Sequence, residues 1–239
     1  LKMNHLIFNF ICGNDKLMEF ILCKSKFQFP YRINSKNTKN MINVFLHETS
    51  INKTFNVGGA KLNIYVSLEP YETENKISNN FLSQFDIAIV SDGTINADNV
   101  VKIPNYIPWL YFKAVMIRNK HNLKFIEPKN ELEKPNSDRI LLISSNKKYY
   151  KSHNYRIELL NTFKRSKLDS KIDYYGFGFK DFESKIELLP RYRHAIVLEC
   201  SQQDHYISEK LIDSLICGHN VLYWGSPIVN NYLSYPYIQ

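Results

Sequence analysis

Residues with useful chemistry gather in one short stretch near the C-terminal end of the chain. Glu199 ends an apolar segment with the composition of a buried strand, and a polar loop follows it. Glu209 and Lys210 then open an expected helix, Ser208–Cys217, whose apolar residues recur at helical spacing. Backbone N–H groups at a helix N-terminus, together with a lysine, are able to hold a phosphate group. Such residues also open many helices that bind no ligand, so both interpretations stay open here.

The order of elements around these residues is strand, loop, helix, strand and turn. The second strand ends at Tyr223–Trp224, and the turn Gly225–Pro227 follows it. In open parallel sheets, ligands lie beyond the carboxyl ends of the strands, which is where Glu199 and Gly225 fall. The elements must therefore be parallel βα units if these residues are to share one edge.

The whole chain alternates short apolar, β-branched segments with amphipathic ones. This alternation predicts an α/β fold built from parallel strands. The expected strands are Leu6–Cys12, Ile42–His47, Asn63–Glu69, Asp86–Ser91, Val100–Pro104, Ile140–Ser144, Lys171–Tyr175, Ala195–Glu199 and Val221–Trp224, and the expected helices are Lys16–Leu22, Tyr155–Lys167 and Ser208–Cys217.

A polar segment, Glu127–Asp138, interrupts this alternation. It contains two prolines, several charges and few apolar residues, which is typical of an exposed linker. We therefore expect a domain boundary there, with an N-terminal domain over residues 1–130 and a C-terminal domain over residues 131–239. Each is expected to be Rossmann-like, with the ligand in the crevice between them.

The composition of the 239 residues argues against several classes of protein. The mean hydropathy is -0.34 and no apolar run reaches about 18 residues, so no transmembrane helix is expected. The four scattered cysteines, with no C-x-x-C pair, argue against a disulfide scaffold or a zinc site. The net charge of +8 favours anionic partners or serves solubility alone. Because the lysines are dispersed, nucleic acid is not expected as a partner.

The stretch Tyr192–Pro227 resembles the donor-binding motif of the α-1,3/4-fucosyltransferases, glycosyltransferase family 10. Shorter segments at Ser144–Arg156 and Asp173–Gly178 resemble the same family, and the first half of the chain matches it more weakly. Two positions depart from the family pattern, because Cys200 replaces an asparagine and Val221 replaces a proline. The residues that match in register are Glu199, Ser201, Asp204, Tyr206, Ser208, Glu209, Lys210, Asp213, Gly218, Tyr223, Trp224, Gly225 and Pro227.

The resemblance implies a GT-B-like α/β architecture, with the acceptor side in the N-terminal domain (residues 1–130) and the donor-binding side in the C-terminal domain (residues 131–239). It also implies an inverting transfer of fucose from GDP-fucose to a hydroxyl group of a glycan. The departing diphosphate develops negative charge, which cations must stabilise where no metal does so. No Asp-x-Asp motif is evident, so a metal-independent site is expected, with no cofactor besides the GDP-fucose substrate. The residues implied to bind the donor are Asn146, Lys147, Arg156, Glu199, Tyr206, Glu209 and Lys210.

The chemistry of these side chains suggests individual roles. Arg156 and Lys210, with Lys147 as a third contact, are expected to hold the diphosphate. Glu209 is expected to accept hydrogen bonds from the ribose hydroxyl groups, and Tyr206 to contact the ribose.

A single inverting displacement also needs a base that removes the proton of the acceptor hydroxyl. Glu69 ends a predicted strand in the first half and resembles the carboxylate assigned as the base in the family. Glu199 also ends a strand, but its place in the donor half favours a role in orienting the sugar or the donor loop.

Two alternatives keep the fold but change the function. One is a transferase for another nucleotide sugar, and the other is a degenerate, non-catalytic protein that binds a nucleotide or a glycan. The acceptor is expected to be an oligosaccharide or a lipid-linked glycan, in protein glycosylation or surface polysaccharide synthesis, with a peripheral membrane contact. The expected location is the cytoplasm or inner membrane surface of a bacterium, or the Golgi of a eukaryote. Relatives usually continue beyond their last motif, so we expect the chain to be either a fragment or an incompletely active transferase.

Overall fold

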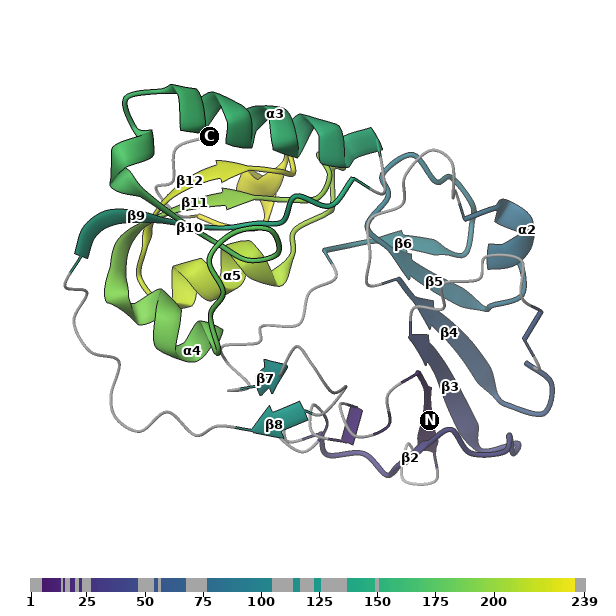
Figure 1. Cartoon of the computed structure of the whole chain (residues 1–239). Coiled ribbons are helices and arrows are strands. Elements are labelled where there is room, and N and C mark those ends of the chain that lie inside the picture. Colours follow the sequence, from purple (N-terminus) through teal and green to yellow (C-terminus); the bar gives the residue numbers. More distant parts are fainter. Residues whose placement is uncertain are drawn as a thin grey trace. The chain divides into compact units, whose positions relative to one another are not determined.

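The computed structural model of the chain divides into two compact units (Figure 1). The N-terminal unit comprises Leu1–Asn105 with Gln203–Tyr206, and the C-terminal unit comprises Tyr106–Gln202 with Ile207–Gln239. Of the predicted linker, only residues 137 and 138 are described, and they begin a strand. The structure describes residues 6–13, 15, 18–19, 22, 27–46, 54–55, 57–67, 77–104, 114–116, 123–125, 137–148 and 151–234.

A six-stranded sheet, parallel throughout, forms the N-terminal unit. The five strands predicted in this half are confirmed, with slightly shifted ends. The sequence does not predict β2, because its three residues follow Pro30, include Arg32 and lack the apolar run that marks the predicted strands. In the spatial order β2-β1-β3-β4-β5-β6, the strands are Tyr31–Ile33, Ile7–Ile11, Met41–Leu46, Leu62–Val66, Ile87–Val90 and Val100–Lys102.

Aromatic side chains fill one core of this unit. Phe45 on β3 and Tyr65 on β4 are buried, and the short helix α2 (Asn79–Leu82) adds Phe81. The ring centroids of Tyr65 and Phe81 lie 5.2 Å apart in an edge-to-face arrangement, which is a favoured geometry for aromatic pairs.

Buried asparagines cross-link three strands of the same sheet. Asn9, Asn43 and Asn63 stand in register on β1, β3 and β4. Asn9 Nδ2 donates to Asn43 Oδ1 at 3.0 Å, and Asn43 Nδ2 donates to Asn63 Oδ1 at 2.9 Å. This ladder satisfies polar groups that would otherwise destabilise the interior of the sheet.

The C-terminal unit contains a four-stranded parallel sheet. All four strands predicted in this half are confirmed. In the spatial order β10-β9-β11-β12, they are Ile172–Tyr175, Ser137–Ile143, Tyr192–Leu198 and Asn220–Trp224.

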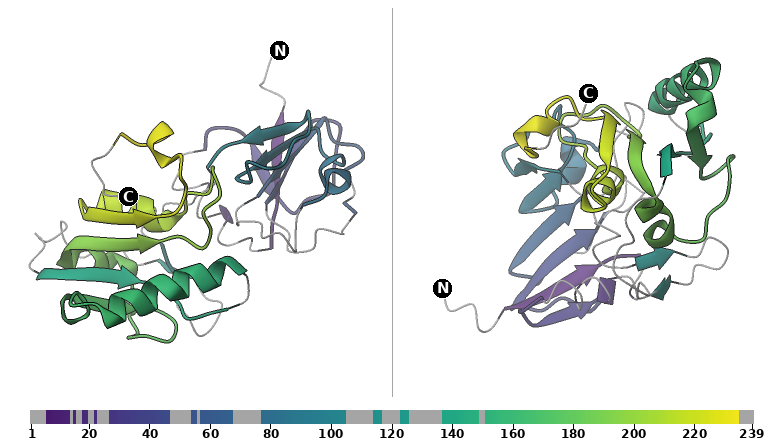
Figure 2. Two further views of the ribbon diagram at one scale, coloured as in Figure 1. Left: turned by 90° about the horizontal axis from the view of Figure 1, so that it is seen from above. Right: turned by 90° about the vertical axis from the view of Figure 1, so that its left-hand side faces the viewer.

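Helices cover both faces of this sheet. On one face, Leu160 of α3 (Lys151–Arg165) packs with Leu142 of β9 and Ile196 of β11. On the other, Leu188 of α4 (Lys185–Leu188) and Leu211 of α5 (Glu209–Ile216) pack with alternate strand residues. Figure 2 shows this layering from two further sides, with α3 in green and α5 in yellow-green.

Other short elements complete the described part of the chain. The strands β7 (Ala114–Met116) and β8 (Leu123–Phe125) form an antiparallel pair, which the sequence does not predict. Of the helix predicted at Lys16–Leu22, only Met18, Glu19 and Leu22 are described, and all three are helical. Short 3-10 helices lie at Asp169–Lys171, Leu189–Arg191 and Val229–Asn231. Within the described residues, no helix is long and apolar enough to span a membrane.

Candidate functional site

The carboxyl ends of β9 and β11 form the centre of the candidate site. In the sheet, β10 lies on one side of β9, while β11 lies on the other. The chain therefore adds its next strand on one side of β9 and the strand after that on the opposite side. This change in strand order makes the ends of β9 and β11 a topological switch point, where open parallel sheets bind their ligands. Asn146 and Lys147 lie in the loop after β9, and Glu199 directly follows β11.

Arg156 connects the two strand ends. It lies on α3 and is only 4% exposed. Its Nη1 donates to Cys200 Sγ at 3.3 Å, and its Nη2 donates to Ser145 Oγ at 3.3 Å and to the Lys147 carbonyl oxygen at 3.2 Å. The buried Nε has no hydrogen-bond partner among the described residues. Because none of the three acceptors is a carboxylate, this buried cation is suited to a bound anion.

His153 lies one helical turn before Arg156 and is also buried. Burial, together with the positive charges of Arg156, Lys147 and Lys210, lowers the pKa of His153 to about 4. The imidazole is therefore neutral at pH 7. Because Arg156, Lys147 and Lys210 all lower the pKa of the His153 ring, these three cations and His153 lie close together near the switch point.

Glu199 anchors the start of α5. It is fully buried, with Oε1 accepting from Ser208 N at 2.8 Å and Oε2 accepting from Ser208 Oγ at 2.6 Å. Burial raises the pKa of Glu199, while Lys210, 3.5 Å away, and Ser208 oppose that rise. Ser208 in turn caps the helix, because its Oγ accepts from Lys210 N at 3.3 Å. The predicted start of α5 at a serine cap is thus confirmed.

Glu209 lies in the first turn of α5 between two lysines. Its Oε1 is 3.9 Å from Lys210 Nζ and 3.4 Å from Lys185 Nζ, and Lys185 also pairs with the buried Asp213 at 3.2 Å. Burial alone would raise the pKa of Glu209, but Lys210 and Lys185 outweigh it and hold that pKa at about 2. Glu209 is therefore an ionised hydrogen-bond acceptor at any physiological pH.

A glycine turn after β10 supports the loop after β9. Gly176 and Gly178 have φ angles of 110° and 84°, a region that favours glycine. A Cβ atom on Gly178 would overlap the Asn146 side chain. Between the two glycines, Phe177 places its ring 5.2 Å from Lys147 Nζ, as a cation–π pair. This turn therefore positions both Asn146 and Lys147.

The C-terminal unit brings together six of the residues predicted to bind the donor. Tyr206 is buried, but it belongs to the segment that groups with the N-terminal unit. Glu69, the predicted base, lies outside the described residues. The six are Asn146, Lys147, Arg156, Glu199, Glu209 and Lys210.

Three residues near this cluster are not among the donor-binding residues predicted from the sequence. His153 shares a helix face with Arg156 three positions later, so helical spacing alone could have indicated it. Lys185 and Cys200 reach the site from a separate helix and from a loop. No local sequence signal indicates the role of Lys185, because it acts through a partner 24 residues away. Cys200 is marked in the sequence as a departure from the family pattern, but its partner Arg156 lies 44 residues away. Among the described residues, no three His, Cys, Asp or Glu side chains are placed to hold a metal ion.

Comparison with known proteins gives a match in structure only. No protein-family model matches the sequence, and no curated protein sequence is similar to it. The structure is similar to that of an α1,3-fucosyltransferase solved with GDP-fucose, with a TM-score of 0.54 and 16% identity over 94% of this chain and 70% of that one. The structure solved with GDP gives 0.53 and 15% over 94% and 69%, and a further α1,3-fucosyltransferase structure gives 0.52 and 15% over 94% and 70%.

This likeness establishes the fold. The chain has the architecture of α1,3-fucosyltransferases, and the predicted GT-B-like α/β class with parallel sheets is confirmed. The crevice between two facing domains stays a prediction, as do the roles of the individual site residues.

Proposed function

We propose that this protein is a glycosyltransferase that transfers fucose from GDP-fucose to a hydroxyl group of a glycan, with inversion at the sugar. The observation that carries the proposal is the buried Arg156, which links the ends of β9 and β11 through acceptors that include no carboxylate. The structural similarity to α1,3-fucosyltransferases adds support, because proteins with this fold have been solved with GDP-fucose and with GDP.

The diphosphate of the donor would lie against the basic side chains of the C-terminal unit. Arg156 would donate to phosphate oxygens from its guanidinium group, and Lys147 and Lys210 would add positive charge. As the glycosidic bond breaks, negative charge grows on the departing GDP. Cations fixed in advance stabilise that charge without reorganisation, so they lower the barrier to transfer.

Glu209 and Glu199 would have different roles in donor binding. Glu209 is ionised and only partly buried, which suits a carboxylate that accepts hydrogen bonds from the two ribose hydroxyl groups. Glu199 is fully buried and occupied by Ser208, so it would hold the start of α5 in place beside the donor. We therefore keep Glu69 as the proposed base and Glu199 as a positioning residue.

A thermal-shift comparison tests the choice of donor. A ligand that binds only the folded protein raises its apparent stability in proportion to the logarithm of concentration over Kd. We expect GDP-fucose to raise the melting temperature more than GDP-mannose, and UDP-glucose to have little effect. A larger shift with UDP-glucose would assign the site to another nucleotide sugar. No shift with any of the three would contradict the proposal.

A further inference from the structure

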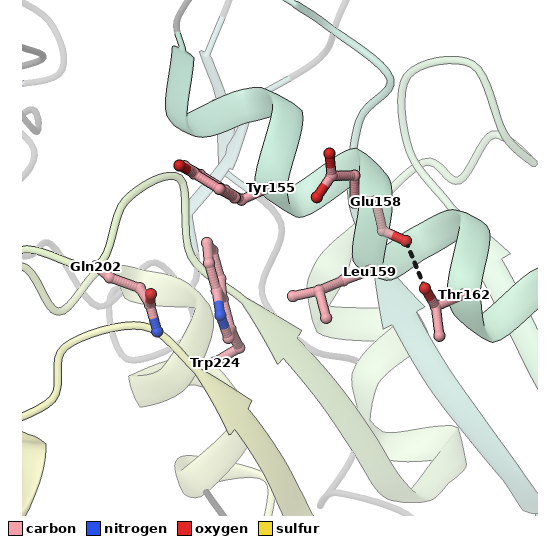
Figure 3. Close-up of a pocket in the computed structure, with 6 residues that line it drawn as sticks. All are labelled: Tyr155, Glu158, Leu159, Thr162, Gln202 and Trp224. Carbon is pink, nitrogen blue, oxygen red and sulfur yellow. Dashed lines mark hydrogen bonds between the residues drawn. The ribbon is translucent and has the colours of Figure 1, made fainter.

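A pocket opens on the C-terminal unit beside the candidate donor site (Figure 3). It has a volume of about 270 Å³ and lies between α3 and the ends of β11 and β12. Helix α3 contributes Tyr155, Glu158, Leu159 and Thr162, which recur at the spacing of one helix face. The opposite side consists of Gln202, in the loop after β11, and Trp224, at the end of β12.

The apolar part of this pocket is aromatic. Tyr155 is 55% exposed although it is a large hydrophobic side chain, and in Figure 3 its ring lies near one end of the Trp224 indole, with Leu159 at the side of that indole. Tyrosine and tryptophan combine an apolar ring with a polar edge, so they suit ligands that have both kinds of surface.

The polar part of the pocket is neutral or acidic. Glu158 supplies a carboxylate and Gln202 an amide, and the Thr162 hydroxyl donates to the Glu158 carbonyl oxygen at 2.9 Å, which leaves its oxygen able to accept. The neighbouring cation, Arg156, donates to acceptors on the loops after β9 and β11. A phosphate would therefore meet a carboxylate here, whereas a neutral ligand with many hydroxyl groups would find both donors and acceptors.

The residues that line the pocket are joined to residues of the donor site by a backbone hydrogen bond and by the loop after β11. Glu199 N donates to the Trp224 carbonyl oxygen at 2.8 Å, and Gln202 follows two residues after Cys200, which accepts from Arg156. A ligand in the pocket would consequently lie close to the strand ends at which the donor is proposed to bind.

We propose that this pocket binds one pyranose ring of a neutral oligosaccharide and is a subsite for the glycan acceptor. The proposal rests on the proposed function, in which a glycan is the second substrate. The rings of Tyr155 and Trp224 pack against the C–H face of the sugar, and Glu158 and Gln202 bind its hydroxyl groups. A volume of about 270 Å³ is just below the range of drug-sized pockets, which fits a single sugar ring.

Saturation-transfer NMR with a panel of neutral di- and trisaccharides at millimolar concentration tests this site. We expect the unmodified chain to bind at least one member of the panel, and Tyr155→Ala to weaken that binding about tenfold, because a stacked ring is lost. Tyr155→Phe retains the ring and should retain most of the affinity. Asn161→Ala, on the exposed face of the same helix, is the control and should change nothing.

Several results would overturn the proposal. One is an absence of binding by the whole panel, and another is equal affinity in Tyr155→Ala and the control. A third is a loss of GDP affinity in Tyr155→Ala, measured by calorimetry, which would assign the pocket to the nucleobase. The proposed function fails separately: a chain that binds the panel through Tyr155 but binds no GDP has a glycan pocket and no donor site.

Discussion

At the scale of single residues, Arg156 is the strongest indication of a bound ligand, because it is a buried cation that contacts no carboxylate among its described acceptors. A buried guanidinium normally pairs with a carboxylate, because leaving a buried charge uncompensated is costly. Its described acceptors here are a thiol, a hydroxyl group and a carbonyl oxygen. An anion bound between β9 and β11 would supply the missing negative charge.

The pKa of His153 should change when that anion binds. Its pKa is about 4 because of burial and the neighbouring cations, and a bound diphosphate would offset those charges. We predict that GDP raises the pKa of His153 toward its unperturbed value of roughly 6.5. A titration of the His153 ring resonances by NMR, with and without GDP, measures this shift directly. An unchanged pKa in the presence of saturating GDP would place the diphosphate elsewhere.

The same histidine gives a pH dependence of stability. Because the folded state lowers the pKa of His153, the unfolded chain binds more protons between pH 6.5 and about 4. Its contribution to the free energy of unfolding is therefore complete above about pH 6.5 and declines as the pH falls toward 4. GDP should reduce this decline, since it raises the folded-state pKa. Melting temperatures measured across this range, with His153→Gln as the reference, isolate the effect.

Glu69 carries the chemistry in the proposed division of roles. Glu69→Gln preserves the size of the side chain but removes the base, so turnover should fall by roughly 10²–10⁴-fold. GDP affinity should stay nearly unchanged, because six of the seven proposed donor-binding residues lie in the C-terminal unit. Transfer rates and GDP calorimetry on the same variant separate these two effects. Full turnover in Glu69→Gln, together with loss of turnover in Glu199→Gln, would assign the base to Glu199.

At the scale of elements, the close approach of β12 to the loop after β11 fixes one side of the candidate site. A Cβ atom on Gly225 would lie 2.5 Å from Glu199 Cγ and would overlap the Tyr223 hydroxyl. We predict that Gly225→Ala destabilises the protein by about 1–3 kcal/mol, the usual cost of overpacking a core. It should also weaken GDP binding, because Glu199 holds the start of α5.

Gly218 provides the matched control for that substitution. It ends α5 with a φ of 72°, and a Cβ atom there would meet nothing within 4 Å. Asparagine tolerates this left-handed conformation, so Gly218→Asn should cost far less than Gly225→Ala. Chemical denaturation of both variants gives the comparison. Equal losses of stability would mean that the contact with Glu199 is not the cause.

The elements that could be predicted from the sequence are those with a clear period and a clear end. Helix α5 has apolar residues at helical spacing, a serine cap and a terminal glycine, and the strand before it is a continuous apolar run. The elements that could not be predicted are short: β2, β7, β8, α2 and α4 have three or four residues each. Runs of that length rarely complete a period that distinguishes a strand from a helix. The equally short β5, β6 and β10 could be predicted because most of their residues are β-branched or aromatic.

The site shows the same limit of sequence analysis. Glu209 and Lys210 could be predicted because they are neighbours at a helix start, where a phosphate site is expected. The ion pairs of Lys185 could not, because packing of α4 against α5 brings its amine to Glu209 and Asp213 from 24 and 28 residues away. Cys200 could be identified as a departure from the family pattern, but its hydrogen bond to Arg156 depends on the placement of α3 over the sheet.

At the scale of the whole molecule, the absence of an Asp-x-Asp motif and the number of basic side chains favour transfer without a metal ion. We predict that fucose transfer continues in the presence of EDTA, because Arg156, Lys147 and Lys210 stabilise the departing diphosphate. Transfer measured before and after chelation, then with added manganese, tests this. Activity that is lost in EDTA and restored by manganese would show that the cations of the chain are not sufficient.

The central claim is that the C-terminal unit binds a nucleoside diphosphate through the basic side chains at the ends of β9 and β11. Calorimetric titration of GDP into the unmodified chain, Lys210→Ala and Lys167→Ala tests it most directly. Lys167 is an exposed residue just after α3, so its substitution removes the same charge away from the site. We predict that Lys210→Ala loses about 1.5–3 kcal/mol of GDP binding, the range for hydrogen bonds to charged groups, while Lys167→Ala binds as the unmodified chain does. Equal affinities in the two variants, or no GDP binding by the unmodified chain, would contradict it.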